Sequence, residues 1–231
     1  MSARRIVVAI DGPAGAGKST IARRIAARLG FLYIDTGAMY RAVALWARRL
    51  DVSLDDHLKL EQLARAAVIE LRSNPLGVVL NGEDITELIR NPEISQEASK
   101  VSAIPGVRRA LVEKQRAMGE VNSIVMEGRD IGTVVFPEAA IKIFLDAAAE
   151  VRAQRRLDEL HAKGQTSLAL ETVLKDINER DTRDRTRGEA PLMQAPDAEY
   201  VDSTRESIEA VEERILMLVR ARTSNGKELH K

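Results

Sequence analysis

The sequence has 231 residues, 45% of them hydrophobic, and its 35 basic residues are balanced by 35 acidic ones. This balance excludes a global basic field of the kind that attracts nucleic acid or an anionic membrane, so any anion site must be local. The chain has no cysteine, so we expect neither disulfides nor thiolate metal sites. It has no apolar stretch near the roughly 18 residues of a membrane span and no room for a signal peptide before its first strand, so we expect a cytoplasmic protein. We also expect a monomer.

Short apolar runs alternate with longer segments of helical periodicity. A strand, a tight loop and a helix at Ser19–Leu29 come first, and Gly30 follows as a helix-ending residue. The runs that we expect to form strands are Ile6–Ile10, Phe31–Ile34, Ser123–Met126, Ile141–Leu145 and Glu199–Val201. Because strands alternate with helices and are mostly apolar on both faces, we predict an α/β fold with a parallel sheet covered by helices.

Residues 36–104 contain too many elements for one crossover connection, and we expect them to form an inserted lobe. Turn signals between β-rich runs at 68–85 predict a small antiparallel sheet in this lobe. A helix at Ser53–Ala67 precedes the small sheet, and Ser53 with Asp56 forms a pattern close to a capping box at its start.

Residues 151–187 form a second irregular stretch, in which two charged helices are joined by a polar hinge. The stretch is rich in arginine, and we expect it to form a helical lid separate from the core. The expected divisions are a core of residues 1–35, 105–150 and 188–222, the inserted lobe of 36–104 with its small sheet at about 63–104, the lid of 151–187 and a flexible tail of 223–231.

The stretch "GPAGAGKST" at residues 12–20 matches G-x-x-x-x-G-K-[ST] between a strand and a helix. Glycines let consecutive backbone N–H groups turn toward an anion, and the helix adds the positive end of its dipole. Lys18 supplies a full charge to the β- and γ-phosphates, and the Ser19 hydroxyl can bind Mg²⁺. The loop therefore predicts a nucleoside triphosphate site formed by Gly12, Pro13, Ala14, Gly15, Ala16, Gly17, Lys18, Ser19 and Thr20.

A bound triphosphate does not fix the class of protein, since GTPase switches, motor ATPases and small-molecule kinases share this loop. Two stretches follow strands at the same edge of the sheet as the loop, "DTGAMYR" at 35–41 and "EGRDIGTVVFP" at 127–137. In the first, Thr36 is expected to cap the next helix. In the second, Arg129 can neutralise a further phosphate and Asp130 can accept a hydrogen bond.

A third stretch, "ERDTRDRTR" at 179–187, is strongly charged. At about 100° per residue, one helix face carries Arg180, Arg183, Asp184 and Arg187. Asp181 and Arg185 are expected to pair at i,i+4 on the other side. Three guanidiniums on one face repel each other unless an anion arrives, so this face predicts an anion site.

Taken together, these stretches resemble bacterial cytidylate kinases, a family of nucleoside monophosphate kinases. The resemblance covers about residues 6–215 and rests on "DGPAGAGKST", "YIDTGAMYR", "GRDIGTVVFP", "RDTRDRTRGEAPL" and "VDST", in that order. It implies a P-loop kinase core with a five-stranded parallel sheet, an inserted monophosphate-binding lobe made of a small antiparallel sheet plus helices, and an arginine-rich lid. It also implies transfer of the γ-phosphoryl of ATP to CMP or dCMP, with Mg²⁺, giving ADP and CDP or dCDP.

The resemblance also implies roles for individual residues. The acceptor phosphate would be clamped by Arg41, Arg129 and Arg187, and cytosine would be read by Ser99, Arg108 and Asp130. The sugar would be held by Arg180 and Asp184, with Asp35, Thr36 and Tyr40 near the acceptor. The catalytic charges would be those of Lys18, Arg129, Arg180 and Arg187. The choice between Arg108 and its neighbour Arg109 stays open at this point.

Base chemistry agrees with this reading, since a carboxylate can accept from the amino group of cytosine while an arginine donates to its ring acceptors. The acceptor phosphate is already an anion, so no general base is needed, and the sequence shows no obvious Ser-His or His-carboxylate pair.

Other readings are a P-loop kinase for UMP, AMP or shikimate, a GTP-binding switch, and a noncatalytic nucleotide-binding module. The switch is disfavoured because no guanine-reading Asn-Lys-x-Asp segment follows any predicted strand.

Overall fold

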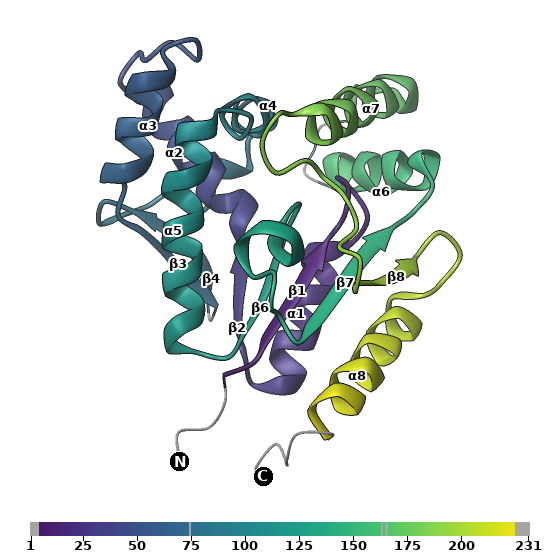
Figure 1. Ribbon diagram of the computed structural model, residues 1–231. Coiled ribbons are helices and arrows are strands. Elements are labelled where there is room, and N and C mark those ends of the chain that lie inside the picture. Colours follow the sequence, from purple (N-terminus) through teal and green to yellow (C-terminus); the bar gives the residue numbers. More distant parts are fainter. Residues whose placement is uncertain (1–4, 74, 163, 165, 225–231) are drawn as a thin grey trace.

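The computed structural model describes residues 5–73, 75–162, 164 and 166–224 (Figure 1). At its centre is a parallel sheet with the strand order β2-β6-β1-β7-β8. The strands are β1 (Val7–Asp11), β2 (Leu32–Asp35), β6 (Ile124–Gly128), β7 (Ile141–Asp146) and β8 (Glu199–Asp202). The predicted α/β core with a five-stranded parallel sheet is confirmed. The P-loop leaves β1, so it lies at the middle of the carboxyl edge of the sheet, where open α/β sheets bind ligands.

Each observed strand ends one or two residues beyond its predicted end, because the hydrogen-bonded ladder continues into an acidic residue. These acidic residues are Asp11, Asp35, Glu127, Asp146 and Asp202. The apolar pattern stops one residue too early in four strands and two residues too early in β6, since it registers hydrophobic side chains and not backbone pairing. Register pairs Asp35 with Glu127 and Asp11 with Gly128, so the central strands bring their carboxylates to one edge.

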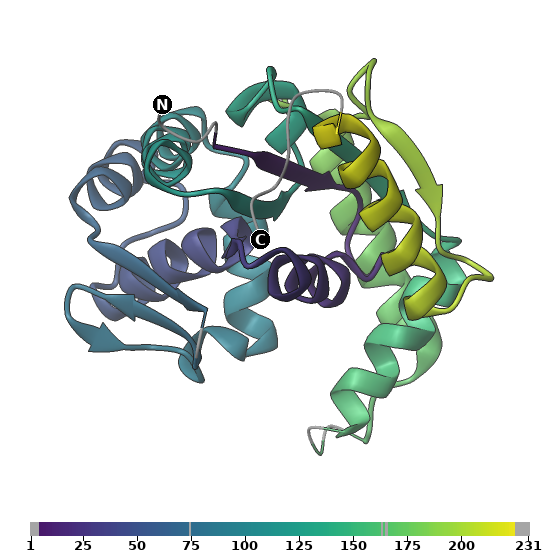
Figure 2. The same ribbon diagram turned by 90° about the horizontal axis from the view of Figure 1, so that it is seen from below.

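Helices cover both faces of the sheet (Figure 2). One face is covered by α1 (Lys18–Leu29) and α8 (Ile208–Ser224), whose Ile25 and Ile215 pack on the sheet core. On the other face lie α5 (Pro105–Val121) and a π-helical turn, η2 (Ile131–Val135). As predicted, Gly30 closes α1 in a left-handed conformation with φ 66°. Within the part of the chain that the structure describes, no helix is both long and apolar enough to cross a membrane.

The inserted lobe has its own hydrophobic core. Its elements are α2 (Thr36–Arg49), α3 (His57–Ala66), β3 (Ile69–Ser73), β4 (Leu76–Leu80), β5 (Glu83–Asp84), the 3₁₀ turn η1 (Leu88–Arg90) and α4 (Pro92–Val101). β3, β4 and β5 form the predicted small antiparallel sheet. The first half of α5 joins this core through Val107 and Leu111, whereas Val112 packs toward the main sheet. The helix α5 therefore connects the inserted lobe to the main sheet.

Two helix caps differ from prediction. Thr36 does not cap α2: Asp35 does, since its Oδ1 accepts from Ala38 N at 3.0 Å. The predicted helix at Ser53–Ala67 begins only at His57, because Asp56 is its cap and accepts from Lys59 N at 3.0 Å. In both places more than one nearby residue is of a type that can cap a helix, and the backbone geometry, not the residue type, decides between them.

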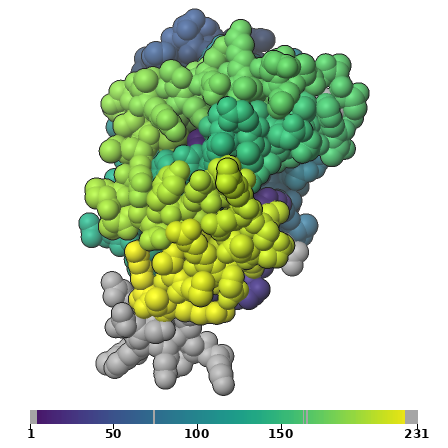
Figure 3. All heavy atoms as spheres, turned by 90° about the vertical axis from the view of Figure 1, so that its right-hand side faces the viewer, coloured from purple at the N-terminus to yellow at the C-terminus, as the bar shows by residue number. Residues whose placement is uncertain are grey.

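The stretch predicted to be a lid consists of two packed helices, α6 (Ala149–Ala162) and α7 (Leu170–Thr186). They share a small apolar cluster of their own, which includes Leu157, Leu160 and Ile177. Figure 3 shows the green lid helices at the end of the molecule opposite the lower part of α8, which is yellow. Part of the predicted hinge, residues 163 and 165, and most of the predicted tail, residues 225–231, lie outside the described residues.

The P-loop is packed against β7 so closely that Gly12 has no room for a side chain. Its φ is +148°, and a Cβ atom there would lie 1.9 Å from the carbonyl oxygen of Leu145. We expect Gly12→Ala to lower the free energy of unfolding by about 3 kcal/mol, from overpacking and backbone strain combined. Gly30→Ala is the matched control, because Gly30 has φ +66° but nothing within 4 Å, and it should cost about 1 kcal/mol. Equal losses in urea unfolding would contradict this packing argument.

Candidate functional site

A cavity of about 730 Å³ opens at the carboxyl edge of the sheet, between the P-loop, the inserted lobe and the lid. Seven of the nine predicted loop residues line it, namely Ala14, Gly15, Ala16, Gly17, Lys18, Ser19 and Thr20. Gly12 and Pro13 do not: Gly12 packs against β7, and the carbonyl of Pro13 accepts a hydrogen bond from Lys18 Nζ at 2.6 Å. The lysine is thus folded back across its own loop.

Lys18 lies in an unusually positive environment. Its side chain is buried, with only 5% of the residue exposed. Burial first, and then the guanidiniums of Arg129 and Arg180, lower the pKa of Lys18 to about 7, although Glu127 acts in the opposite direction. Burial and Arg129 also lower the pKa of Arg180 to about 10. A polyanion bound at the P-loop relieves this repulsion, so the cavity favours phosphate.

All of the predicted acceptor-site residues line the same cavity as the P-loop. They are Asp35, Thr36, Tyr40, Arg41, Ser99, Arg108, Arg129, Asp130, Arg180, Asp184 and Arg187. They come from β2, α2, α4, α5, the end of β6 and the lid, which are far apart in the sequence. The structure therefore brings together the set of residues that the sequence singled out, and the following contacts describe how each is held.

On the lobe side, Asp35 organises the start of α2. One carboxylate oxygen caps the helix, and the other accepts from Arg41 at 2.8 Å. Thr36 instead donates its hydroxyl proton to the carbonyl of Glu127 at 2.7 Å. These contacts fix Arg41 at the cavity wall and tie the lobe to the end of β6.

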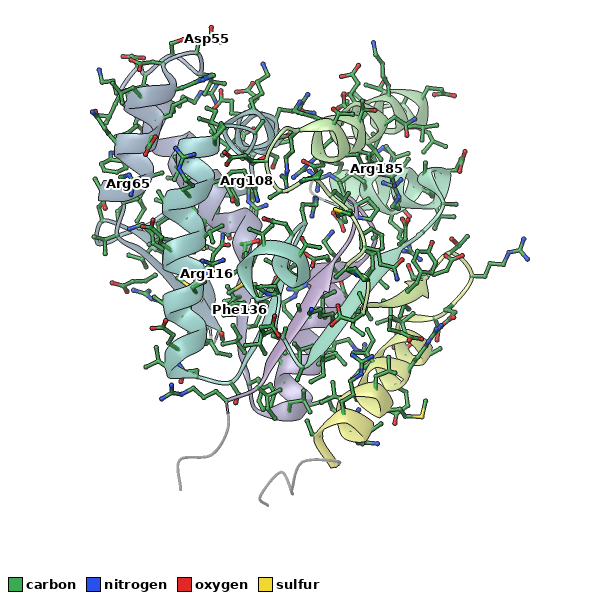
Figure 4. The ribbon with its side chains drawn as sticks, viewed as in Figure 1. Asp55, Arg65, Arg108, Arg116, Phe136 and Arg185 are labelled. Carbon is green, nitrogen blue, oxygen red and sulfur yellow. The ribbon has the colours of Figure 1, made fainter. Side chains whose placement is uncertain are left out.

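Arg108 and Asp130 form a buried ion pair at the inner end of the cavity. The guanidinium of Arg108, labelled in Figure 4, also lies over the ring of Tyr40, with its central carbon 5.6 Å from the ring centroid. Arg108 is 3% exposed, whereas the side chain of Arg109 is 54% exposed and lies near Glu61 and Glu189 outside the cavity. Of the two adjacent arginines, Arg108 is the one that lines the cavity.

On the lid side, Asp184 lies between two arginines. Its carboxylate accepts from Arg129 at 2.9 Å and lies 3.8 Å from Arg187. Although burial raises the pKa of Asp184, the guanidiniums of Arg129 and Arg180 hold it below its usual value. Arg187 is not on the helix face predicted for it, because α7 ends at Thr186 and Arg187 follows in extended conformation. It still reaches the cavity and lies 3.7 Å from Asp130.

The predicted pair of Asp181 with Arg185 is wrong. Asp181 is buried and pairs with Arg152 of α6 at 2.7 Å, and Arg152 also donates to the carbonyl of Ala14 at 3.0 Å. Arg185 is exposed on α7. Local i,i+4 spacing cannot compete here with a partner on the neighbouring helix, and the result is a direct connection between the lid and the P-loop.

Asp11 holds the segment that carries Arg129 and Asp130. Its two carboxylate oxygens accept from the backbone N–H groups of Ile131 and Gly132 at 2.8 and 2.7 Å. These N–H groups open the π-helical turn η2, and Asp11 satisfies them in place of an external anion. Burial raises the pKa of Asp11 to about 6, against the effect of the two backbone hydrogen bonds.

The sequence analysis assigned no role to Glu127, or to Arg155 and Ser203 on the P-loop side of the cavity. Glu127 is buried at the end of β6 and accepts from the hydroxyls of Tyr33 and Ser19; burial and the nearby Asp35 raise its pKa. Arg155 donates to the side chain and backbone of Ser203, at 3.0 and 2.7 Å, and both residues line the cavity. The signals were present: an acid before "GRDIG", and "ST" directly after the last strand.

The residues around Ser19 fit Mg²⁺. A hydroxyl beside the buried carboxylate of Glu127 and the half-buried carboxylate of Asp35 matches the one or two protein carboxylates that Mg²⁺ uses beside substrate phosphates. Among the described residues no group of three or more His, Cys, Asp or Glu is placed to hold a metal. A Mg²⁺ ion here would take its remaining ligands from substrate phosphates and water. Of the three histidines, His57 and His161 are exposed outside the cavity, and His230 lies outside the described residues.

The central parallel sheet, the P-loop and the arginine-lined cavity define a P-loop phosphotransferase. A family model described as cytidylate kinase matches residues 8–221. The chain is 59% identical over 226 residues to a cytidylate kinase of Solibacter usitatus (strain Ellin6076), and the match covers 97% of each chain. It is 50% identical over 223 residues to a cytidylate kinase of Pelotomaculum thermopropionicum, and that match covers 95% of this chain and 96% of the relative. The protein belongs to the cytidylate kinase family.

Solved structures with a similar fold include a gluconokinase from Sinorhizobium meliloti 1021. That structure has a TM-score of 0.48 and 14% sequence identity, and the similarity covers 98% of this chain and 100% of the gluconokinase chain.

The depressed pKa of Lys18 predicts proton uptake on triphosphate binding. At pH 8 a lysine with a pKa of about 7 is mostly neutral, and a bound phosphate raises its pKa, so binding should take up about 0.9 proton. Calorimetry of a nonhydrolysable ATP analogue in buffers of different ionisation enthalpy measures this number. Lys18→Arg keeps its charge at pH 8 and should show uptake near zero. The same uptake in both proteins would contradict the assignment to Lys18.

Proposed function

We propose that this protein transfers the γ-phosphoryl group of ATP to CMP or dCMP, giving ADP and CDP or dCDP. The observation that carries the proposal is that the P-loop and every predicted acceptor-site residue line one cavity. Membership of the cytidylate kinase family supports the same reaction. Two polyanions that meet end to end in this cavity can react directly, because the groups that neutralise their charge surround both.

In the ATP half of the site, backbone N–H groups of residues 14–20 bind the β- and γ-phosphates, with Lys18 moving from the carbonyl of Pro13 to the phosphate. Ser19 and Glu127 would hold Mg²⁺, which when bound neutralises charge on the phosphates. Arg155 and Ser203 extend the cavity beyond the loop on the side away from the lobe.

In the acceptor half, Arg41, Arg129 and Arg187 clamp the phosphate of the monophosphate. Arg129 and Arg187 leave Asp184 and Asp130 for the stronger phosphate contacts, which an arginine can make with two N–H groups at once. Asp184, relieved of Arg129, is then free to accept from the sugar together with Arg180.

Cytosine is read at the inner end of the cavity by Ser99, Arg108 and Asp130. The Asp130 carboxylate accepts from the amino group of the base, and the Arg108 guanidinium donates to the ring acceptors. Uracil would place an oxygen against the carboxylate, and an unsatisfied buried acceptor costs about 1–3 kcal/mol.

Catalysis then consists of positioning and charge neutralisation. The acceptor phosphate is already ionised near neutral pH and needs no general base. Lys18, Arg129, Arg180 and Arg187 surround the transferred group, and the lid excludes water that would otherwise hydrolyse ATP.

The physiological setting is also part of the proposal. The balanced charge supports small-molecule substrates in place of nucleic acid or a membrane surface, and the lack of cysteine supports a reducing compartment, the cytoplasm. We propose a monomer that acts in pyrimidine nucleotide metabolism.

Acceptor selectivity tests the proposed function. In a coupled assay with ATP, wild-type turnover should be highest with CMP or dCMP and lower with UMP and AMP. Asp130→Asn replaces an acceptor by an amide donor, so kcat/KM for CMP should fall about 10- to 100-fold while the ratio of UMP to CMP activity rises.

Two controls accompany this assay. Lys18→Ala should lose turnover with every acceptor, whereas Asp197→Asn, a carboxylate outside the cavity that pairs with Lys142, should keep the wild-type preference. Preference of the wild type for AMP or shikimate would overturn the proposed function.

A further inference from the structure

We propose that Arg183 is a positioning residue that couples closure of the lid to occupation of the acceptor site. Its guanidinium, on α7 of the lid, donates to the hydroxyl of Ser99, on α4 of the inserted lobe, at 2.6 Å. The inference rests on the proposed function, because it gives Ser99 its role beside cytosine.

Arg183 is not part of the cavity wall. It lies on the outer side of α7 among Asn178, Glu179, Thr182 and Thr186, whereas Ser99 lines the cavity and is 3% exposed. The guanidinium therefore binds the hydroxyl of a residue that lines the cavity, while Arg183 itself lies outside the cavity lining. For this reason we assign it a positioning role.

The contact is not a by-product of an ion pair. Among the residues that the structure describes, no carboxylate lies within ion-pair distance of Arg183, and its side-chain hydrogen bond is to the neutral hydroxyl of Ser99. A hydrogen bond from a charged donor is stronger than one between neutral groups, and this one spans two parts of the chain with separate apolar cores. It forms only when the lid and the lobe come together.

Arg183 is linked directly to two charged residues of the cavity. It precedes Asp184, and its backbone carbonyl accepts from the N–H of Arg187 at 3.2 Å. A base that orders Ser99 thus stabilises the end of α7, which carries Asp184 and is followed by Arg187, and a closed lid in turn holds Ser99 toward the base. Each substrate should then raise the affinity for the other by the same factor, as thermodynamic linkage requires.

Calorimetry of a nonhydrolysable ATP analogue, with and without saturating CMP, tests this coupling. In the wild type, CMP should tighten binding of the analogue at least about tenfold, and in Arg183→Ala this enhancement should fall close to one. Binding of the analogue without CMP should stay within twofold of wild type in Arg183→Ala. Arg185→Ala is the matched control, since it removes the same charge from the same helix at an exposed position outside the cavity, and it should keep the full enhancement.

A double-mutant cycle identifies the partner. Ser99→Ala weakens CMP binding by itself, and adding Arg183→Ala should cause no further change in KM for CMP, because the two side chains act through one contact. Additive effects, an uncoupled wild type, or equal coupling in Arg183→Ala and Arg185→Ala would overturn the proposal. Wild-type protein without CMP kinase activity would instead overturn the proposed function, so the two failures can be told apart.

Discussion

The structure depends on keeping several positive charges together in a buried site. Burial, together with repulsion from Arg129 and Arg180, lowers the pKa of Lys18 to about 7. Buried carboxylates make this arrangement possible: Asp184 lies against Arg129 and Arg187, and Asp130 lies against Arg108 and Arg187. Each carboxylate offsets guanidinium charge, and under the proposed function a phosphate takes its place. The site is therefore assembled before substrate binds.

The fold supplies the positions for these charges. Parallel strands end at one edge, which brings the P-loop after β1 beside Glu127 and Arg129 at the end of β6. Asp11 holds η2 in place, and the pair of Arg152 with Asp181 connects the lid to the loop. Polar contacts between elements fix the site, while each of the apolar cores stabilises its own part of the chain.

Much of the fold could be predicted from the sequence, because the strands and the P-loop are carried by local residue patterns, while the resemblance supplied the set of residues expected at the acceptor site. The errors arose where a side chain had a choice of partner. Asp181 could pair along its helix with Arg185 but pairs with Arg152 on α6, and Asp35 caps α2 where Thr36 was expected. Local spacing gives no information about a partner on another element.

Glu127 was missed for a different reason. Glu127 is the first residue of the motif "EGRDIGTVVFP", which the sequence analysis singled out. Its role depends on Ser19 and Asp35, which only the fold of the sheet places beside it. For the same reason the sequence could not decide whether Arg108 or Arg109 lines the cavity. Adjacent residues on a helix point about 100° apart, and only the packing of α5 decides which one faces the cavity.

A crystal structure with CMP and a nonhydrolysable ATP analogue tests the central claim most directly. We expect the guanidiniums of Arg129 and Arg187 to have left Asp184 and Asp130 for oxygens of the acceptor phosphate, with Lys18 on the triphosphate. Nucleotides bound in the same cavity while Arg129 stays on Asp184 and Lys18 stays on Pro13 would contradict the view that carboxylates hold the place of substrate phosphate.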